Sequence, residues 1–125
     1  MGYRSQVVLA VSKELMPHFL SVMAKCPEAR KLVFTHNDEL DQNYEGEGHF
    51  FVRWDEVKWY QDSYDDVAAI QNFVEEADSD SFELGEDHGG SSENFRFVRT
   101  GEESDDVACF GCGFEHIYPY TNISW

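Results

Sequence analysis

The segment from Phe50 to Val74, FFVRWDEVKWYQDSYDDVAAIQNFV, constrains the fold of this chain most, because a clear strand pattern runs directly into a clear helix pattern. Between residues 48 and 54, aromatic and β-branched side chains suit a half-buried pleated surface and predict a strand. A helix is predicted at about residues 63–77, where apolar residues recur at helical spacing. Its apolar stripe consists of Tyr64, Val67, Ile70, Val74 and Ala77.

The beginning of this helix carries its own signal. Ser63 and Asp66 form a variant of the capping box, in which the serine oxygen accepts a hydrogen bond from a backbone N–H. Asp62 and Asp65 add negative charge at the positive end of the helix dipole. The face turned to water is predicted to hold Asp65, Gln71, Asn72, Glu75 and Glu76.

The remainder of the chain predicts one more helix and four more strands. The helix follows Ser12, a capping residue, and runs to about Lys25, with Pro17 favouring a late start. Pro119 indicates that the last, aromatic strand lies at an edge of the sheet. The four strands are predicted at residues 3–11, 31–36, 94–100 and 116–125.

The predicted element order β-α-β-β-α-β indicates an α+β fold of the ferredoxin-like, split β-α-β type. Such a fold has an antiparallel sheet with two helices on one face, and here an extra strand would follow at the C-terminus. A length of 125 residues suits one domain, 1–125, with a single core. Acidic loops are expected at about 37–48, 78–93 and 101–106.

Charge is distributed unevenly along the sequence. The net charge is −16, but residues 1–31 hold five Lys and Arg against two Glu, a balance of +3, so residues 32–125 carry −19. Between Trp59 and Phe95 there are eleven Asp and Glu and no Lys or Arg. Such a field repels nucleic acid and anionic lipid, and it speeds association with a cationic partner.

Membrane and secreted classes are disfavoured. No apolar run approaches the roughly 20 residues needed to span a bilayer, and the first residues lack a signal-peptide pattern. Three cysteines, an odd number, argue against a secreted disulfide scaffold. We therefore expect a soluble, cytoplasmic protein.

A half-formed zinc pattern occurs late in the chain, at Cys109-x-x-Cys112-x-x-x-His116. A structural zinc site usually has two tight pairs of ligands, whereas here His88 or Cys26 would have to complete the set from a distance. The alternative is that Cys109 and Cys112 pack as small apolar residues beside a Gly-rich bend. We favour this alternative and predict no metal or other cofactor.

No catalytic signature accompanies the five histidines and 25 acidic residues. Hydrolytic catalysis needs a nucleophile beside a base, or carboxylates with separated pKa values. The glycines at 85, 89 and 90 lie among acids that would repel a phosphate. The chain is therefore predicted not to be an enzyme.

The segment from Arg53 to Tyr60 concentrates aromatic and basic residues between the predicted strand and helix. One interpretation is structural: Trp54 and Trp59 bury the corner while the basic residues pair with neighbouring acids. The other is functional: exposed aromatic faces ringed by charge form an interface hot spot. We favour the structural interpretation, and both hold in part if Trp54 points inward and Tyr60 outward.

The acids between residues 62 and 106 also have two interpretations. A solvated acidic surface keeps a protein soluble and monomeric. The excess here goes beyond that need, because no Lys or Arg compensates it over 37 residues. We predict a general acidic interaction surface, with nucleic-acid mimicry as its more specialised form. Its partner-binding residues are predicted to be Asp62, Asp65, Asp66, Glu75, Glu76, Asp78, Asp80, Trp59 and Tyr60.

Three motifs stand out when they are taken together. They are MGYRSQV at residues 1–7, W-x-E-V-K-W-Y from Trp54 running into Tyr64-x-x-Val67, and FVRTGEE-x-DD from Phe97. Together they resemble a family of small proteins of tailed bacteriophages and prophages. No catalytic residue is attached to these motifs, and the cysteine pair and the aromatic tail lie outside the pattern.

The resemblance implies a protein made in the cytoplasm of an infected host bacterium. Small acidic phage proteins of that kind often bind and block host machinery, including CRISPR effectors and other defence proteins. The leading hypothesis is therefore a phage protein, monomeric or homodimeric, that inhibits a host defence or nucleic-acid-processing protein by binding its basic surface. The alternatives are a small-ligand-binding or metal-dependent phage protein and a phage assembly module. Neither nucleic acid nor membrane is an expected direct partner.

Overall fold

Strand β1 lies in the middle of a five-stranded antiparallel sheet whose strand order is β2-β3-β1-β4-β5. The computed structural model describes residues 5–59, 65–84, 89–101 and 107–117. Its α+β architecture confirms the predicted class, with three α-helices in the described residues where two were expected. The elements are β1 (Ser5–Val11), α1 (Met16–Ala24), α2 (Pro27–Phe34), β2 (Glu39–Tyr44), β3 (His49–Val57), α3 (Asp65–Asp78), the 3₁₀ helix η1 (Ser91–Asn94), β4 (Phe95–Thr100) and β5 (Val107–Phe110).

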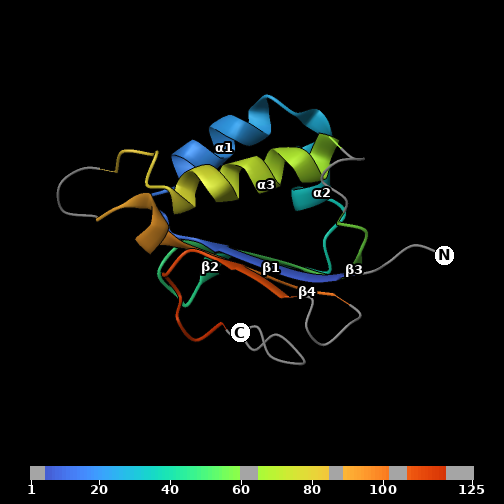
Figure 1. The fold of residues 1–125 in the computed structure, drawn as a ribbon. Coiled ribbons are helices and arrows are strands. Elements are labelled where there is room, and N and C mark those ends of the chain that lie inside the picture. Colours follow the sequence, from blue (N-terminus) through green and yellow to red (C-terminus); the bar gives the residue numbers. More distant parts are fainter. Residues whose placement is uncertain (1–4, 60–64, 85–88, 102–106, 118–125) are drawn as a thin grey trace.

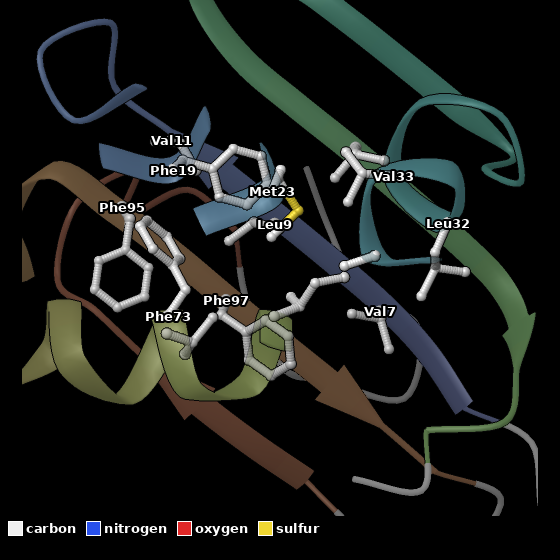
Figure 2. Close-up of a cluster of buried hydrophobic side chains, with 14 of the residues drawn as sticks. Val7, Leu9, Val11, Phe19, Met23, Leu32, Val33, Phe73, Phe95 and Phe97 are labelled. Atoms are coloured by element: carbon white, nitrogen blue, oxygen red, sulfur yellow. The ribbon is translucent and has the colours of Figure 1, made fainter. Parts of the chain in front are cut away.

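The three α-helices cover one face of the sheet, and the main core lies between them and the strands (Figure 1). Successive side chains of a strand point to opposite faces, so Val7, Leu9 and Val11 of β1 all point toward the helices. The rings of Phe19 on α1 and Phe73 on α3 pack edge to face, with centroids 5.0 Å apart. Figure 2 shows these side chains gathered in one cluster.

The opposite face of the sheet carries a smaller apolar cluster. Its buried members are Val8, Ala10, Phe51, Val98 and Ile117. Ile117 and the half-buried Phe114 belong to the segment after β5, which therefore covers part of this face. Arg96 anchors the segment, because its Nε donates to the Ile117 carbonyl at 3.2 Å and its Nη1 to the Gly111 carbonyl at 2.9 Å.

The predictions for β1, β3, β4 and α1 are confirmed in the described residues. The range 48–54 falls almost wholly within β3, and 94–100 contains β4. Helix α1 begins at Met16 with Pro17 in its first turn, which is the late start that the proline favoured.

The strand predicted at residues 31–36 is wrong, because most of this range lies in helix α2. Pro27 occupies the first turn of α2, where its missing N–H is tolerated. Ala29, Leu32 and Val33 are buried at positions i, i+3 and i+4, so packing of a helical face overrides the strand preference of Val33 and Phe34.

The segment at 37–48 was expected to be an acidic loop, and this is wrong for Glu39–Tyr44, which forms the edge strand β2. Its exposed edge is polar, so it lacks the apolar alternation that identifies a strand in a sequence. Glu39 is held by Arg53 of β3, with Nη1 2.8 Å from Oε1. Residues 37–38 and 45–48 lie outside strands, and the turn at 45–48 has positive φ at Glu45, Gly46 and Gly48.

The strand predicted at 116–125 is not formed in its described part. Strand β5 ends at Phe110, and the residues from Gly111 to Ile117 form bends and turns. Residues 118–125 lie outside the described residues, as do 85–88 and 102–106 of the predicted acidic loops.

Helix α3 confirms the predicted apolar stripe as far as the structure describes it. Its buried stripe residues are Val67, Ile70, Val74 and Ala77. Ser63 and Tyr64, the predicted cap and first stripe residue, lie outside the described residues. The prediction that Gln71 faces water is wrong, because its side chain is buried at 7% exposure and bonds to Trp59.

Candidate functional site

Helix α3 belongs to the helical layer that covers one face of the sheet (Figure 1), and it turns several polar side chains to solvent. The exposed residues of this helix are Asp65, Asn72, Glu75, Glu76 and Asp78. They recur at helical spacing opposite the buried stripe, so the scaffold fixes them on one face. The predicted exposure of all but Gln71 is therefore confirmed.

The last turn of α3 and the residues after it form an acidic end, which comprises Glu75, Glu76, Asp78 and Asp80. The last turn contains no basic residue. Among the described residues, no Lys, Arg or His forms an ion pair with Glu75 or Glu76. Because a helix C-terminus carries partial negative charge, both carboxylates stand where the helix dipole disfavours them.

Asp78 and Asp80 have structural partners as well as exposure. Asp78 Oδ1 accepts a hydrogen bond from the Gly111 N–H at 2.9 Å, and Asp80 Oδ1 accepts one from the Ser92 N–H at 2.9 Å. The hydrogen bonds from Ser92 lower the pKa of the Asp80 carboxyl. These two acids therefore fasten the end of α3 to η1 and to the turn after β5.

The N-terminal end of α3 lies in a different electrostatic environment. The Cys26 thiol donates a weak hydrogen bond to the Asp65 carbonyl, with Sγ and O 3.9 Å apart. This contact places Asp65 beside the junction of α1 and α2. Lys25 lies at this junction, and helix α2 carries the exposed Arg30 and Lys31. Glu28 in the first turn of α2 and the acids Asp65 and Asp66 offset these three positive charges, so the helical layer is mixed in charge at the start of α3 and acidic at its end.

Trp54 in β3 and Trp59 just after it follow the structural interpretation. Trp54 and Trp59 are 2% and 8% exposed, and their rings lie 5.5 Å apart. Trp54 Nε1 donates to the Leu32 carbonyl and Trp59 Nε1 to Gln71 Oε1, each at 3.1 Å. Trp59 has little surface to present to a partner, whereas Tyr60 and Asp62 lie outside the described residues.

The half-formed zinc pattern is not assembled in the structure. No group of three His, Cys, Asp or Glu side chains converges within the described part of the chain. Cys109 and Cys112 are both exposed at the level of the whole residue. The Cys109 thiol is nevertheless partly shielded from water, and this desolvation raises its pKa. Cys112 Sγ lies 3.4 Å from the Ser92 carbonyl, while His116 has a different set of neighbours. His88 lies outside the described residues.

His116 belongs to an aromatic cluster that the sequence did not reveal. Its Nε2 lies 2.7 Å from the Tyr44 hydroxyl and 3.8 Å from Glu45 Oε2. Burial, followed by the charges of nearby acids including Glu45, raises the pKa of Tyr44 to about 12. The phenol therefore stays protonated near neutral pH, which disfavours a nucleophilic role, and it shares a hydrogen bond with His116 Nε2 whose direction depends on the imidazole tautomer. The two residues are 72 positions apart, so no local pattern linked them.

Comparison with protein-family models, with curated proteins and with solved structures found no match to this chain. In the residues that the structure describes, no helix has both the length and the apolar content required to cross a membrane. The functional argument therefore rests on the geometry and charge of the molecule itself.

Proposed function

We propose that this chain is a non-enzymatic phage protein that binds a basic surface on a host defence or nucleic-acid-processing protein and inhibits it in the host bacterial cytoplasm. The observation that carries this proposal is the position of Glu75 and Glu76. Both are exposed in the last turn of α3, where the described residues provide no cation for them.

Local stability alone does not account for that position. Carboxylates at a helix C-terminus are destabilising by about 0.3–1 kcal/mol each at low ionic strength. Asp78 and Asp80 compensate by accepting backbone hydrogen bonds, but Glu75 and Glu76 accept none through their side chains in the described structure. Residues that oppose local stability without compensation are characteristic of functional sites.

A charge-mimicking role is the more specialised form of the same proposal. Asp65 and Glu75 lie ten positions apart on one helix, so their backbones are separated by about 15 Å along its axis. Carboxylates fixed at the two ends of this span offer a basic groove negative charges at a set separation, as a nucleic-acid backbone does. The surrounding acidic field would speed the encounter with such a groove.

The fold that presents this surface is proposed to be of the ferredoxin-like type. In support, β1 is flanked by β3 and β4, and β2 pairs only with β3 among the described strands. The helices α1 and α2 occupy the connection from β1 to β2, and α3 occupies the connection from β3 to β4. Strand β5 would be an addition at the β4 edge.

The test is affinity capture from bacterial lysate with the intact protein as bait, at low and raised salt and with nuclease present. A specific partner with a basic surface, lost at raised salt and retained after nuclease treatment, is the expected result. The charge-reversal variant replaces Asp65, Glu75 and Glu76 by Lys and should lose this partner. Asp78 is left intact because its carboxylate supports the Gly111 turn.

A matched control separates local charge from total charge. Replacing Glu45, Glu47 and Glu56 by Lys makes the same change in net charge on exposed residues of the sheet and its hairpin. If both triple variants lose the partner equally, the acidic face of α3 has no special role. Capture that survives reversal at α3 would overturn the proposal.

A further inference from the structure

Helix α1 has an exposed face without charge, next to the acidic helix. Its sequence, MPHFLSVMA, contains no Asp, Glu, Lys or Arg. The exposed residues are Pro17, Leu20, Ser21 and Ala24, which recur at i, i+3, i+4 and i+7 and so form one stripe. Leu20 is 46% exposed and, with Val107, is one of two exposed large hydrophobic residues in the described structure.

Side-chain contacts fix α1 beside α3. Phe19, adjacent to Leu20, packs against Phe73, and the His18 ring lies 5.0 Å from Phe82, just beyond the end of α3. His18 Nε2 also lies 2.9 Å from the Glu83 carbonyl. The two helices run side by side above the sheet (Figure 1). Packed helix axes are about 8–10 Å apart, so one bound helix could touch both outer surfaces.

The charges at the two ends of this surface differ. Beyond Ala24, the stripe of α1 ends at the exposed Lys25. The start of α1 lies near the end of α3, because His18 contacts Phe82 and Phe19 contacts Phe73, and the last turn of α3 carries Glu75 and Glu76. A partner would therefore meet an apolar strip that ends at Lys25 and has the acidic end of α3 near its start.

We propose that the outer faces of α1 and α3 together dock an amphipathic basic helix of the partner protein. Its apolar stripe would cover Leu20 and the small residues Ser21 and Ala24, which allow close approach of a helix backbone. Its Lys and Arg flank would lie over Glu75 and Glu76. This inference rests on the proposed function and specifies the chemistry of the partner.

Charge complementarity favours this occupant over the alternatives. Nucleic acid and anionic membranes are repelled by the acidic end of α3. A second copy of this chain would carry the same net charge of −16, which opposes self-association at low salt. A basic partner without an apolar stripe would leave the Leu20 strip uncovered.

The experiment uses the full chain and two fluorescent 18-residue peptides built from Leu, Lys and Ala. One places Leu at helical spacing with Lys beside the stripe, and the other is a scramble of identical composition. Fluorescence anisotropy at about 0.05 M and about 0.5 M salt measures both affinities. The amphipathic peptide is expected to bind about tenfold more tightly than the scramble, because only it buries an apolar face against α1.

Two pairs of variants locate the contact. Leu20→Ser should weaken binding of the amphipathic peptide about fivefold or more and leave the scramble unchanged, whereas Val107→Ser, at the other exposed apolar residue, should change neither. The double variant Glu75→Gln, Glu76→Gln should weaken both peptides at low salt. Its control, Glu45→Gln with Glu47→Gln, removes the same charge from the β2–β3 hairpin.

The outcomes separate the inference from the proposed function. Equal binding of the two peptides, or no effect of Leu20→Ser, overturns the docking of an amphipathic helix. If the Glu75 and Glu76 variant still weakens binding more than its control, the acidic surface of the proposed function stands. If that variant also matches its control, both proposals fail.

Discussion

Trp59 donates its indole N–H to the side-chain oxygen of Gln71 over 3.1 Å, and both residues are buried. The bond joins the segment after β3 to the second turn of α3. It thereby helps to fix the position of α3, the helix that carries the acidic face, against the sheet. A buried donor without an acceptor destabilises the folded state. The packing of α3 on the sheet therefore depends on Gln71, a polar residue that the helical pattern had predicted to face water.

Replacing Gln71 by Ala is expected to lower the free energy of unfolding by about 1–3 kcal/mol, because the Trp59 N–H would lose its acceptor in a buried site. Urea denaturation followed by tryptophan fluorescence measures the change. Asn72→Ala, at the exposed neighbouring position, should alter stability by less than about 0.5 kcal/mol. Equal effects of the two substitutions would contradict a structural role for this bond.

Glu75→Gln and Glu76→Gln are each expected to stabilise the protein, by about 0.3–1 kcal/mol at low ionic strength, because they remove negative charge from the negative end of α3. Asp65→Asn at the opposite end should destabilise it by a similar amount. The gains should shrink as salt is added. Urea denaturation at two salt concentrations tests this, and a loss of stability in both Gln variants would show that these acids have stabilising partners.

Tyr44 should make folding stability sensitive to high pH. Its pKa is raised from the ordinary tyrosine value of 10.0 to about 12 in the folded protein, so the folded state favours the protonated phenol. The resulting stabilisation is complete below about pH 10 and is lost as the pH rises toward about 12. The difference between the 295 nm absorbance titrations of the wild type and Tyr44→Phe should report this midpoint. A midpoint near 10 would mean that Tyr44 is solvated like a free tyrosine.

Gly111→Ala should be strongly destabilising. Gly111 has φ +83°, and an added Cβ would collide with the carbonyl oxygen of Phe95. We expect a loss of at least about 2 kcal/mol, from both backbone strain and the clash. Gly46 also has a positive φ, +71°, but a Cβ there meets nothing within 4 Å, so Gly46→Ala should cost only about 1 kcal/mol. Thermal unfolding measures the loss of stability in both variants. Gly46→Ala reports backbone strain alone, and Gly111→Ala reports the same kind of strain together with the steric clash.

Two apolar signals predicted elements correctly: a run of aromatic and β-branched residues, and a division between a core face and a solvent face. The run from Phe50 to Trp54 identified β3, and the spacing of Val67, Ile70 and Val74 identified α3. Helix α2 was missed because its buried face comprises only three residues and ends in strand-favouring Val33 and Phe34. Strand β2 was missed because an edge strand with polar side chains has no such division.

The candidate site was predictable only in part. Exposure of Glu75 and Glu76 followed from the helical pattern, because it depends on local spacing alone. The bonds of Asp78 and Asp80 to Gly111 and Ser92 could not be foreseen, because they join segments separated by 33 and 12 residues. The contact between Tyr44 and His116 depends on the same long-range assembly.

The central position of β1 also determines when this chain can fold during its synthesis. Val11 pairs with Phe50 on one side and with Phe95 on the other, so its two partners emerge 39 and 84 residues later. At about 5–20 residues per second, β1 waits several seconds on the ribosome for its second neighbour. Pairings of such sequence separation also slow folding. Until β4 is made, the nascent chain therefore exposes at least one unpaired edge of an apolar strand, which is a site for aggregation or chaperone binding.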